Sequence, residues 1–177
     1  MYLCLGFMGG LLMAGCSNSM DEIQNFERKT LPTQTIRGGH VIRSDKGNLQ
    51  MVMDAPLILK YTDPKEKTIY PKGVAITFYK STDEATAFFQ SKYAVSFDDR
   101  DVMVARDSVM VIDYRSGDTT YLEDLVWNAP QKRIYSKHPL RSVNGSRITY
   151  GDSFESDDKF ENPQIVRQRG TVEWQDE

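Results

Sequence analysis

Three observations predict an all-β sandwich or open barrel for this chain of 177 residues. From Thr33 onward, Thr, Val, Ile and aromatic residues recur in short runs, which is the composition of strands. No long helical periodicity competes with these runs. Turn-forming residues separate them at intervals, among them Gly38-Gly39, Pro71-Lys72-Gly73, Ser116-Gly117-Asp118 and Asn144-Gly145.

Residues 1–15 are uncharged and apolar, about the size of the apolar part of an export signal. They lead into Met13-Ala14-Gly15-Cys16, which resembles the lipobox of bacterial lipoproteins, whose cysteine is lipidated and becomes the mature N-terminus. We therefore expect a lipoprotein signal peptide over 1–15, lipidation at Cys16 and a membrane anchor. The alternatives are a secretory peptide cut elsewhere and a short buried segment beside an ordinary free cysteine.

Residues 16–32 are polar, with too few apolar residues for more than a marginal helical turn or two. We interpret them as a lipid-anchored tether, followed by one folded domain over 33–177. The expected strands are 35–43, 49–53, 57–61, 74–79, 88–97, 102–105, 108–114, 121–127, 133–137, 147–150 and 164–173.

One stretch of this pattern is ambiguous. Ser81 and Glu84 form a capping-box pattern, and the apolar residues of 85–89 have helical spacing, so 81–93 alone favours one short helix. From Tyr93 onward the residues alternate as in a strand.

A second irregularity lies between two runs of alternating valines. Val102 and Val104 are even-numbered, whereas Val109 and Val111 are odd-numbered. A turn or bulge at Arg106-Asp107 would return both pairs to the same face, so we expect one there.

The composition excludes several classes of function. The net charge is −3 and no basic cluster is present, which argues against nucleic-acid binding. Cys4 and Cys16 both lie in or beside the leader, so we expect neither an internal disulfide nor a cysteine metal site. His40 and His138 lie beside turns without a nucleophile pattern, and the acidic runs lack the spacing of a calcium loop. We expect no enzymatic activity, no metal and no cofactor.

Four segments in order between residues 70 and 158 carry a family resemblance. They read YPKGVAITFY at 70–79, SKYAV at 91–95, DSVMV followed by SGDT and EDLVWN within 107–128, and ITYGDSFESD at 148–157. This series resembles the LptC family, the periplasmic membrane-anchored component of the lipopolysaccharide-export (Lpt) system of Gram-negative bacteria. The leader makes the chain similar to a lipoprotein-type member.

The resemblance implies a twisted, open, β-jelly-roll-like stack of antiparallel strands, with 88–97 a strand throughout. It implies that the protein works in the periplasm, anchored to a membrane, with the inner membrane favoured. It also implies that the protein receives lipopolysaccharide from an inner-membrane ABC transporter and passes it to an LptA-like bridge protein of the same jelly-roll type.

The interior of such a fold holds acyl chains in transit. The alternating apolar residues of the strands form one inward-facing set. From periodicity alone these residues would be an ordinary packed core, whereas the resemblance implies that they bind lipid. Gly151, between Tyr150 and Asp152, is expected to be a structural glycine that matters for assembly. The residues of the expected lipid-binding interior are Ile76, Tyr93, Val95, Val102, Val104, Val109, Val111, Leu125, Trp127, Ile148 and Phe154.

A second class of function stays open. An envelope lipoprotein with a glycan- or peptide-binding β-sandwich would have the same leader and strand pattern. A glycan binder should show exposed aromatic residues on a rim, whereas a lipid carrier should show an apolar interior open at both ends.

Overall fold

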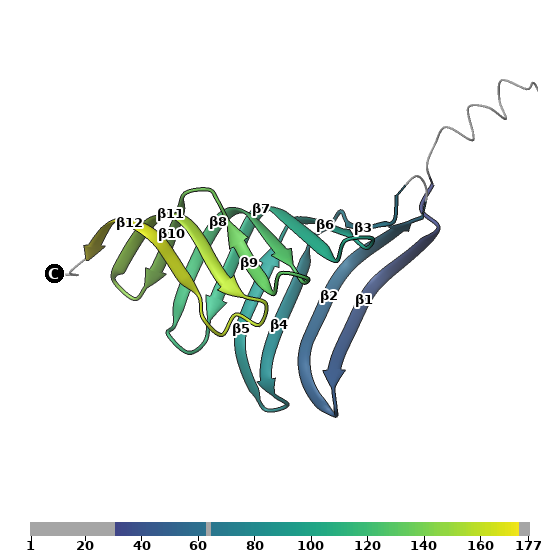
Figure 1. Cartoon of the computed structure of the whole chain (residues 1–177), viewed down its shortest axis with the longest axis horizontal. Helices are drawn as coiled ribbons and strands as arrows, with labels where there is room; N and C mark the ends of the chain where they lie inside the picture. Colours follow the sequence, from purple (N-terminus) through teal and green to yellow (C-terminus); the bar gives the residue numbers. More distant parts are fainter. Residues whose placement is uncertain (1–30, 63–64, 174–177) are drawn as a thin grey trace, which may run out of the picture. The chain divides into compact units, whose positions relative to one another are not determined.

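The computed structural model describes residues 31–62 and 65–173, and these residues are all-β, as predicted (Figure 1). They form one antiparallel sheet of 12 strands, consistent with a jelly-roll-like stack, and contain no helix, so none that is long and apolar enough to cross a membrane. Cys16 and the expected leader lie outside these residues. The strands are β1 (Gln34–Asp45), β2 (Asn48–Tyr61), β3 (Lys67–Tyr70), β4 (Val74–Ser81), β5 (Glu84–Ser91), β6 (Tyr93–Phe97), β7 (Val102–Asp113), β8 (Asp118–Asn128), β9 (Arg133–Ser136), β10 (Leu140–Asn144), β11 (Arg147–Asp157) and β12 (Gln164–Glu173).

The long strands β2, β7, β8 and β11 each change partners along their length. β2 pairs with β4 over 51–54 and with β3 over 59–61, and β7 pairs with β5 over 110–113 and with β6 over 102–106. β8 and β11 each pair with β10 at one end and with β9 at the other. The sheet therefore consists of a first half with β4, β5 and β10 and a second half with β3, β6 and β9, joined by the long strands.

Local irregularities mark the points where the long strands change partners. In β7 the register with β8 shifts between Arg106 and Val109, so the predicted bulge is present. It does not return both valine pairs to one face, since Val109 and Val111 are buried inside and Val102 and Val104 lie on the outer face. Asp107 and Ser108 have φ of 60° and 55°, a left-handed conformation that turns the strand toward its second partner. In β2 the same change occurs around Pro56, which lacks the N–H needed for a central ladder.

Several boundaries differ from the prediction. The predicted strands 49–53 and 57–61 are one strand, and the ambiguous stretch 81–93 is not a helix but mainly the turn and second strand of the β4–β5 hairpin. The expected strand 88–97 is interrupted at Lys92, whose N–H donates to the Asp107 carbonyl at 2.9 Å. β3 and β10 were not predicted, because they are only 4 and 5 residues long and mix polar with apolar residues.

The two halves of the sheet enclose one apolar core. Phe78 of the first half packs edge-on against Trp127 of the second, with ring centroids 5.5 Å apart. Ile76, Val109 and Ile134 are at most 1% exposed. Burial of these side chains is the main force that holds the halves together, at about 1.5–3 kcal/mol for each large side chain.

Gly73 gives a test of this fold at the start of β4. It has φ of +85°, and a Cβ added there would overlap the Ser91 carbonyl oxygen. We expect Gly73→Ala to lower the free energy of unfolding by about 2 kcal/mol or more. Gly117 is the matched control, because its φ is +76° but nothing lies within 4 Å of its Cβ position. Urea unfolding of both variants measures the difference, and equal losses would contradict the role of the close contact.

Candidate functional site

The inner face of the first half-sheet begins apolar and becomes polar along the strand order. Met53, Ile76, Phe89 and Val111 are consecutive cross-strand neighbours, and all are buried. The next two neighbours are Thr120 and Ser142, which are also buried and share a hydrogen bond of 3.0 Å between their hydroxyls. The part of this face that suits hydrocarbon therefore lies on β2, β4, β5 and β7.

The inner face of the second half-sheet carries two cross-strand rows. One row is Tyr70, Ala94, Ala105 and Leu125, all buried. The row beside it contains Met103, Trp127 and Ile134 and ends in Ser156. The hydroxyl of Ser156 and the indole Nε1 of Trp127 are buried without a hydrogen-bond partner among the described residues.

Six of the predicted interior residues lie on these inner faces, and five do not. Ile76, Val109, Val111, Leu125 and Phe154 are buried, and Trp127 is half-buried against the core. The five exceptions lie on outer faces of the sheet and are half-buried, which corrects the prediction: Tyr93, Val95, Val102, Val104 and Ile148.

The error has a simple cause. Alternation separates the two faces of a strand but does not say which face is inside. In β6 and the first part of β7 the inner positions include the small residues Ala94 and Ala105, each at most 1% exposed, together with Met103. Val95 and Val104 pair with each other on the opposite face. The prediction was therefore wrong because it placed the bulky valines inside, where the structure has small alanines.

The described interior is filled by its own side chains. The cavity at its centre has a volume of about 10 Å³, about the size of one water molecule, and is lined by apolar residues. Its lining includes Phe160, from the loop between β11 and β12, which is 1% exposed. The Phe160 ring lies 4.9 Å from that of Phe78 and 6.3 Å from that of Phe154, measured between centroids.

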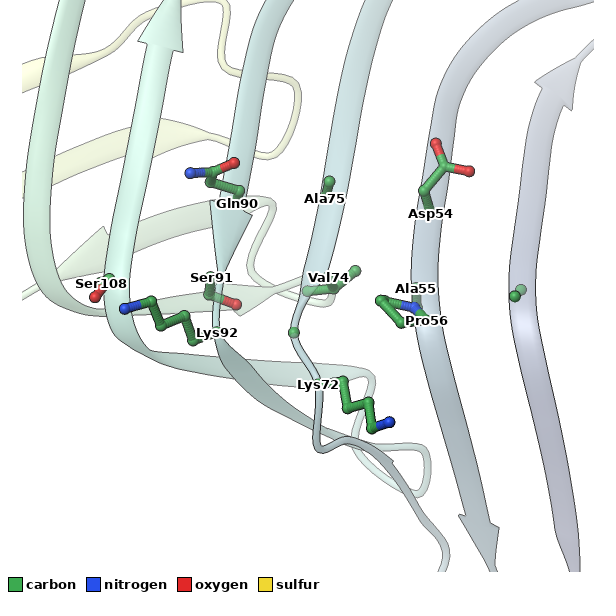
Figure 2. Close-up of a pocket in the computed structure, with 13 residues that line it drawn as sticks. Asp54, Ala55, Pro56, Lys72, Val74, Ala75, Gln90, Ser91, Lys92 and Ser108 are labelled. Atoms are coloured by element: carbon green, nitrogen blue, oxygen red, sulfur yellow. The ribbon is translucent and has the colours of Figure 1, made fainter.

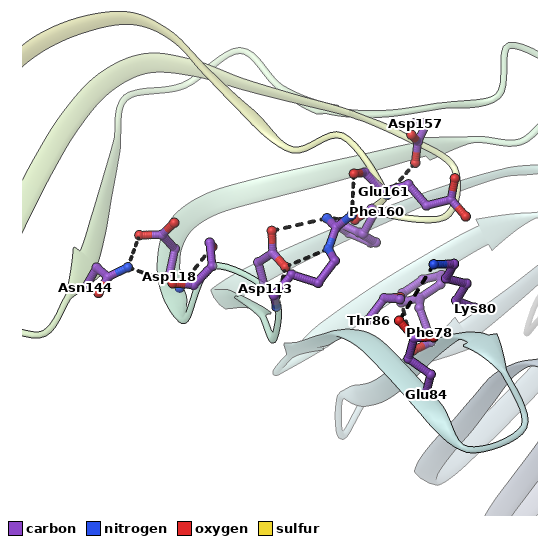
Figure 3. A network of polar contacts seen from close by, with 12 residues as sticks. Phe78, Lys80, Glu84, Thr86, Asp113, Asp118, Asn144, Asp157, Phe160 and Glu161 are labelled. Carbon is purple, nitrogen blue, oxygen red and sulfur yellow. Dashed lines mark hydrogen bonds and ion pairs between the residues drawn. The ribbon is translucent and has the colours of Figure 1, made fainter.

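A polar network holds the Phe160 loop in place (Figure 3). The Arg115 guanidinium donates to the carbonyl oxygens of Phe160 and Glu161 at 2.8 and 2.5 Å. Asp113 fixes that guanidinium through Nε at 3.1 Å and Nη2 at 3.2 Å. On the other side of the loop, Asp157 accepts hydrogen bonds from the backbone N–H groups of Lys159 and Glu161.

A groove of about 510 Å³ lies at the bend of the sheet (Figure 2). It lies where β2 leaves β4 and where β5 ends, and none of the predicted interior residues lines it. Exposed polar side chains border it, and Lys92 extends toward Ser108 (Figure 2). Its lining is mixed, since Ala55, Pro56 and Val74 lie beside these polar side chains.

Gly151 lies in β11 where the partner changes from β10 to β9. A Cβ at this position would overlap the Cγ2 methyl group of Ile165 on β12. Its φ is not in the left-handed region, so close packing against β12, and not a special backbone conformation, is what requires glycine here.

The fold also brings together His138, Asp124 and Ser136, a grouping that sequence spacing did not reveal. Asp124 Oδ1 accepts from the Ser136 hydroxyl at 2.7 Å and lies 3.0 Å from His138 Nδ1. In a catalytic triad the histidine lies between serine and aspartate, whereas here the aspartate lies between them. Ser136 is also only 1% exposed, so the cluster does not form a nucleophile site. Among the described residues, no group of three or more His, Cys, Asp or Glu is placed to hold a metal ion.

No protein-family model matches the chain, and no curated protein matches it significantly in sequence.

The His138 cluster predicts a pH dependence. The hydrogen bond and negative charge of Asp124 raise the pKa of His138 above its ordinary value of 6.5. Because the folded-state pKa is raised, the His138–Asp124 contact stabilises the fold fully below pH 6.5 and is lost as the pH rises through the raised value. NMR titration of the imidazole should give a midpoint above 6.5 that falls in Asp124→Asn and falls less in Glu123→Gln. An unchanged midpoint in Asp124→Asn would contradict this account.

Proposed function

We propose that this protein transports lipopolysaccharide from the inner to the outer membrane, as the LptC-like resemblance implies. It receives lipopolysaccharide from an inner-membrane ABC transporter and passes it along a periplasmic β-jelly-roll bridge. A lipid on Cys16 anchors it, with the inner membrane favoured. One observation carries the proposal: a folded sheet surrounds a single apolar interior, and among the described residues its terminal strands β1 and β12 each pair on one edge only.

The inner faces fit acyl chains in position and chemistry. Met53, Ile76, Phe89 and Val111 form a continuous apolar row across neighbouring strands, so a chain lying across them would contact hydrocarbon at each step. Aromatic rings from both halves of the sheet meet above this row at Phe78 and Trp127. The polar residues Thr120 and Ser142 end the row toward β10.

The terminal strands fit edge-to-edge pairing with neighbours in a bridge. Free backbone N–H and C=O groups on an edge strand can be completed by a strand of another protein. On β12, Arg167 and Arg169 both contact the carboxylate of Asp152, which holds these two positive charges on one face of the strand. Such charges discourage indiscriminate pairing while leaving the edge free for a specific partner.

A glycan-binding function is the second candidate, and one surface feature favours it. Tyr121 and Tyr150 are 41% and 44% exposed and flank Arg141 on the outer face of neighbouring strands. The Arg141 guanidinium lies 4.8 Å from the Tyr121 ring centroid. Exposed aromatic rings of this kind can stack on sugars. Identification of the molecules that co-purify with the mature protein separates the two candidates, because one predicts lipid and the other oligosaccharide.

Photo-cross-linking tests the lipid interior. A photo-reactive amino acid at position 111 or 127 should cross-link to lipopolysaccharide in cells, whereas the same residue at position 104, on the outer face of β7, should not. Val111→Asp should lose bound lipopolysaccharide and cost several kcal/mol of stability, since an unpaired charge would face hydrocarbon. Val104→Asp is the matched control. Cross-links at 104 alone would show that the interior is an ordinary packed core.

A second cross-linking series tests the β12 edge. A photo-reactive residue walked through 164–173 should cross-link to the downstream jelly-roll protein at alternate positions, because successive side chains of a strand point to opposite faces. Residues 74–79 are the internal control, since β4 lies between β2 and β5. Cross-links throughout 74–79 with none in 164–173 would show that β12 is not the docking edge.

A further inference from the structure

The loop between β11 and β12 places an aromatic side chain in the centre of the core. Connecting loops normally lie on the surface, yet Phe160 is 1% exposed and lines the central cavity together with Phe78, Phe89 and Trp127. Phe160 also has φ of 55°, a left-handed conformation that costs a bulky residue energy. Its position is thus maintained by its surroundings and opposed by its own backbone.

The contacts that maintain this position lie at the surface. The side chain of Arg115, which donates to the Phe160 and Glu161 carbonyls, is 39% exposed, and no regular ladder bonds the loop residues to a strand. Hydrogen bonds at an exposed position exchange with water at low net cost. Release of the loop therefore breaks the Arg115 contacts and the hydrogen bonds to Asp157, all of them close to the surface, without separating any pair of strands.

A second cavity adjoins the loop from the Arg115 side. It has a volume of about 330 Å³ and is lined by Asp113, Glu161 and Asn162 together with Val111, Phe154 and Ile165. Phe154 also contacts the Phe160 ring, so the apolar floor of this cavity continues to the place where Phe160 lies. The space beneath Phe160 also adjoins Trp127, whose Nε1–H is buried without an acceptor among the described residues.

We propose that the loop 158–163 covers a latent binding site for a single acyl chain, with Phe160 as a removable plug and Arg115 as the latch. When the Arg115 contacts break and the hydrogen bonds to Asp157 follow, Phe160 leaves the core and a hydrocarbon chain takes its place between Phe78, Phe89 and Trp127. The acyl carbonyl supplies the acceptor that Trp127 Nε1–H lacks. This proposal rests on the lipid-carrying function proposed above, and it explains how an interior with a free volume of about 10 Å³ accepts lipid.

Trp127 provides a direct reporter for this site. The chain has two tryptophans, so the full-length protein with Trp174→Phe contains Trp127 alone. Brominated stearate quenches tryptophan fluorescence on contact, and titration with it in lipid nanodiscs measures access to the interior. We expect Arg115→Met and Phe160→Ala to bind the probe about tenfold more tightly than the parent, because the closed loop lowers the fraction of competent protein. Phe160→Leu, which restores an apolar plug, should return toward the parent.

Matched controls lie on the outer face of the sheet. Arg141→Met removes a guanidinium and Phe88→Ala removes a half-buried phenyl ring, and neither should change the quenching. Equal quenching of the parent and of folded Arg115→Met would overturn the proposal. Where the variants do not fold, hydrogen exchange of the parent decides: the probe should increase exchange at the amides of 159–161, and quenching of Trp127 with these amides still protected would overturn it.

The outcomes separate this inference from the proposed function. Binding of brominated stearate through loop release, without lipopolysaccharide cross-links at 111 or 127, would support the latent site and contradict lipopolysaccharide transport. Lipopolysaccharide cross-links that are the same in the parent, Arg115→Met and Phe160→Leu would overturn the latent site alone.

Discussion

The architecture depends on four strands that must each satisfy their backbone hydrogen bonds with two different partners. β2, β7, β8 and β11 each pair along one edge with two successive strands, and in three of them a local irregularity lies where the partner changes. These irregularities are a bulge at Asp107-Ser108 in β7, a proline at position 56 in β2 and a closely packed glycine at position 151 in β11. These changes of partner turn one sheet onto itself and thereby create the enclosed interior.

The sequence was most informative where periodicity and turn chemistry agree. The all-β class, most strand positions and the bulge near Arg106 followed from alternation and turn residues alone. The missed strands β3 and β10 are short and mix polar with apolar residues, so they give no clear alternation and their pairing depends on neighbouring strands. The capping-box pattern at Ser81 was misleading, because the same polar residues also suit the tight turn of a hairpin.

The candidate site was less predictable than the fold. Val109 and Val111 were placed correctly, but Val102 and Val104 of the same strand point outward, because the inner positions of β7 are odd-numbered on both sides of the bulge. Phe160 was not singled out at all, since it lies in a polar loop with no periodicity. Its burial results from the folding of the sheet, which brings the β11–β12 loop over the turn that carries Arg115. No local pattern encodes a contact of this kind.

The packed interior links stability to the proposed transport. A protein that carries lipid in its core cannot keep an empty cavity, because unfilled apolar space costs about 24 cal/mol for each cubic ångström. Side chains of regular strands could fill that space only permanently, since moving such a side chain out of the core would disrupt the hydrogen bonds between strands. Filling it from a loop avoids this conflict, because Phe160 can leave while the pairing of β7, β8, β9 and β11 persists. A removable loop side chain is therefore a physical means by which a stable folded sheet can also be an acceptor of hydrocarbon.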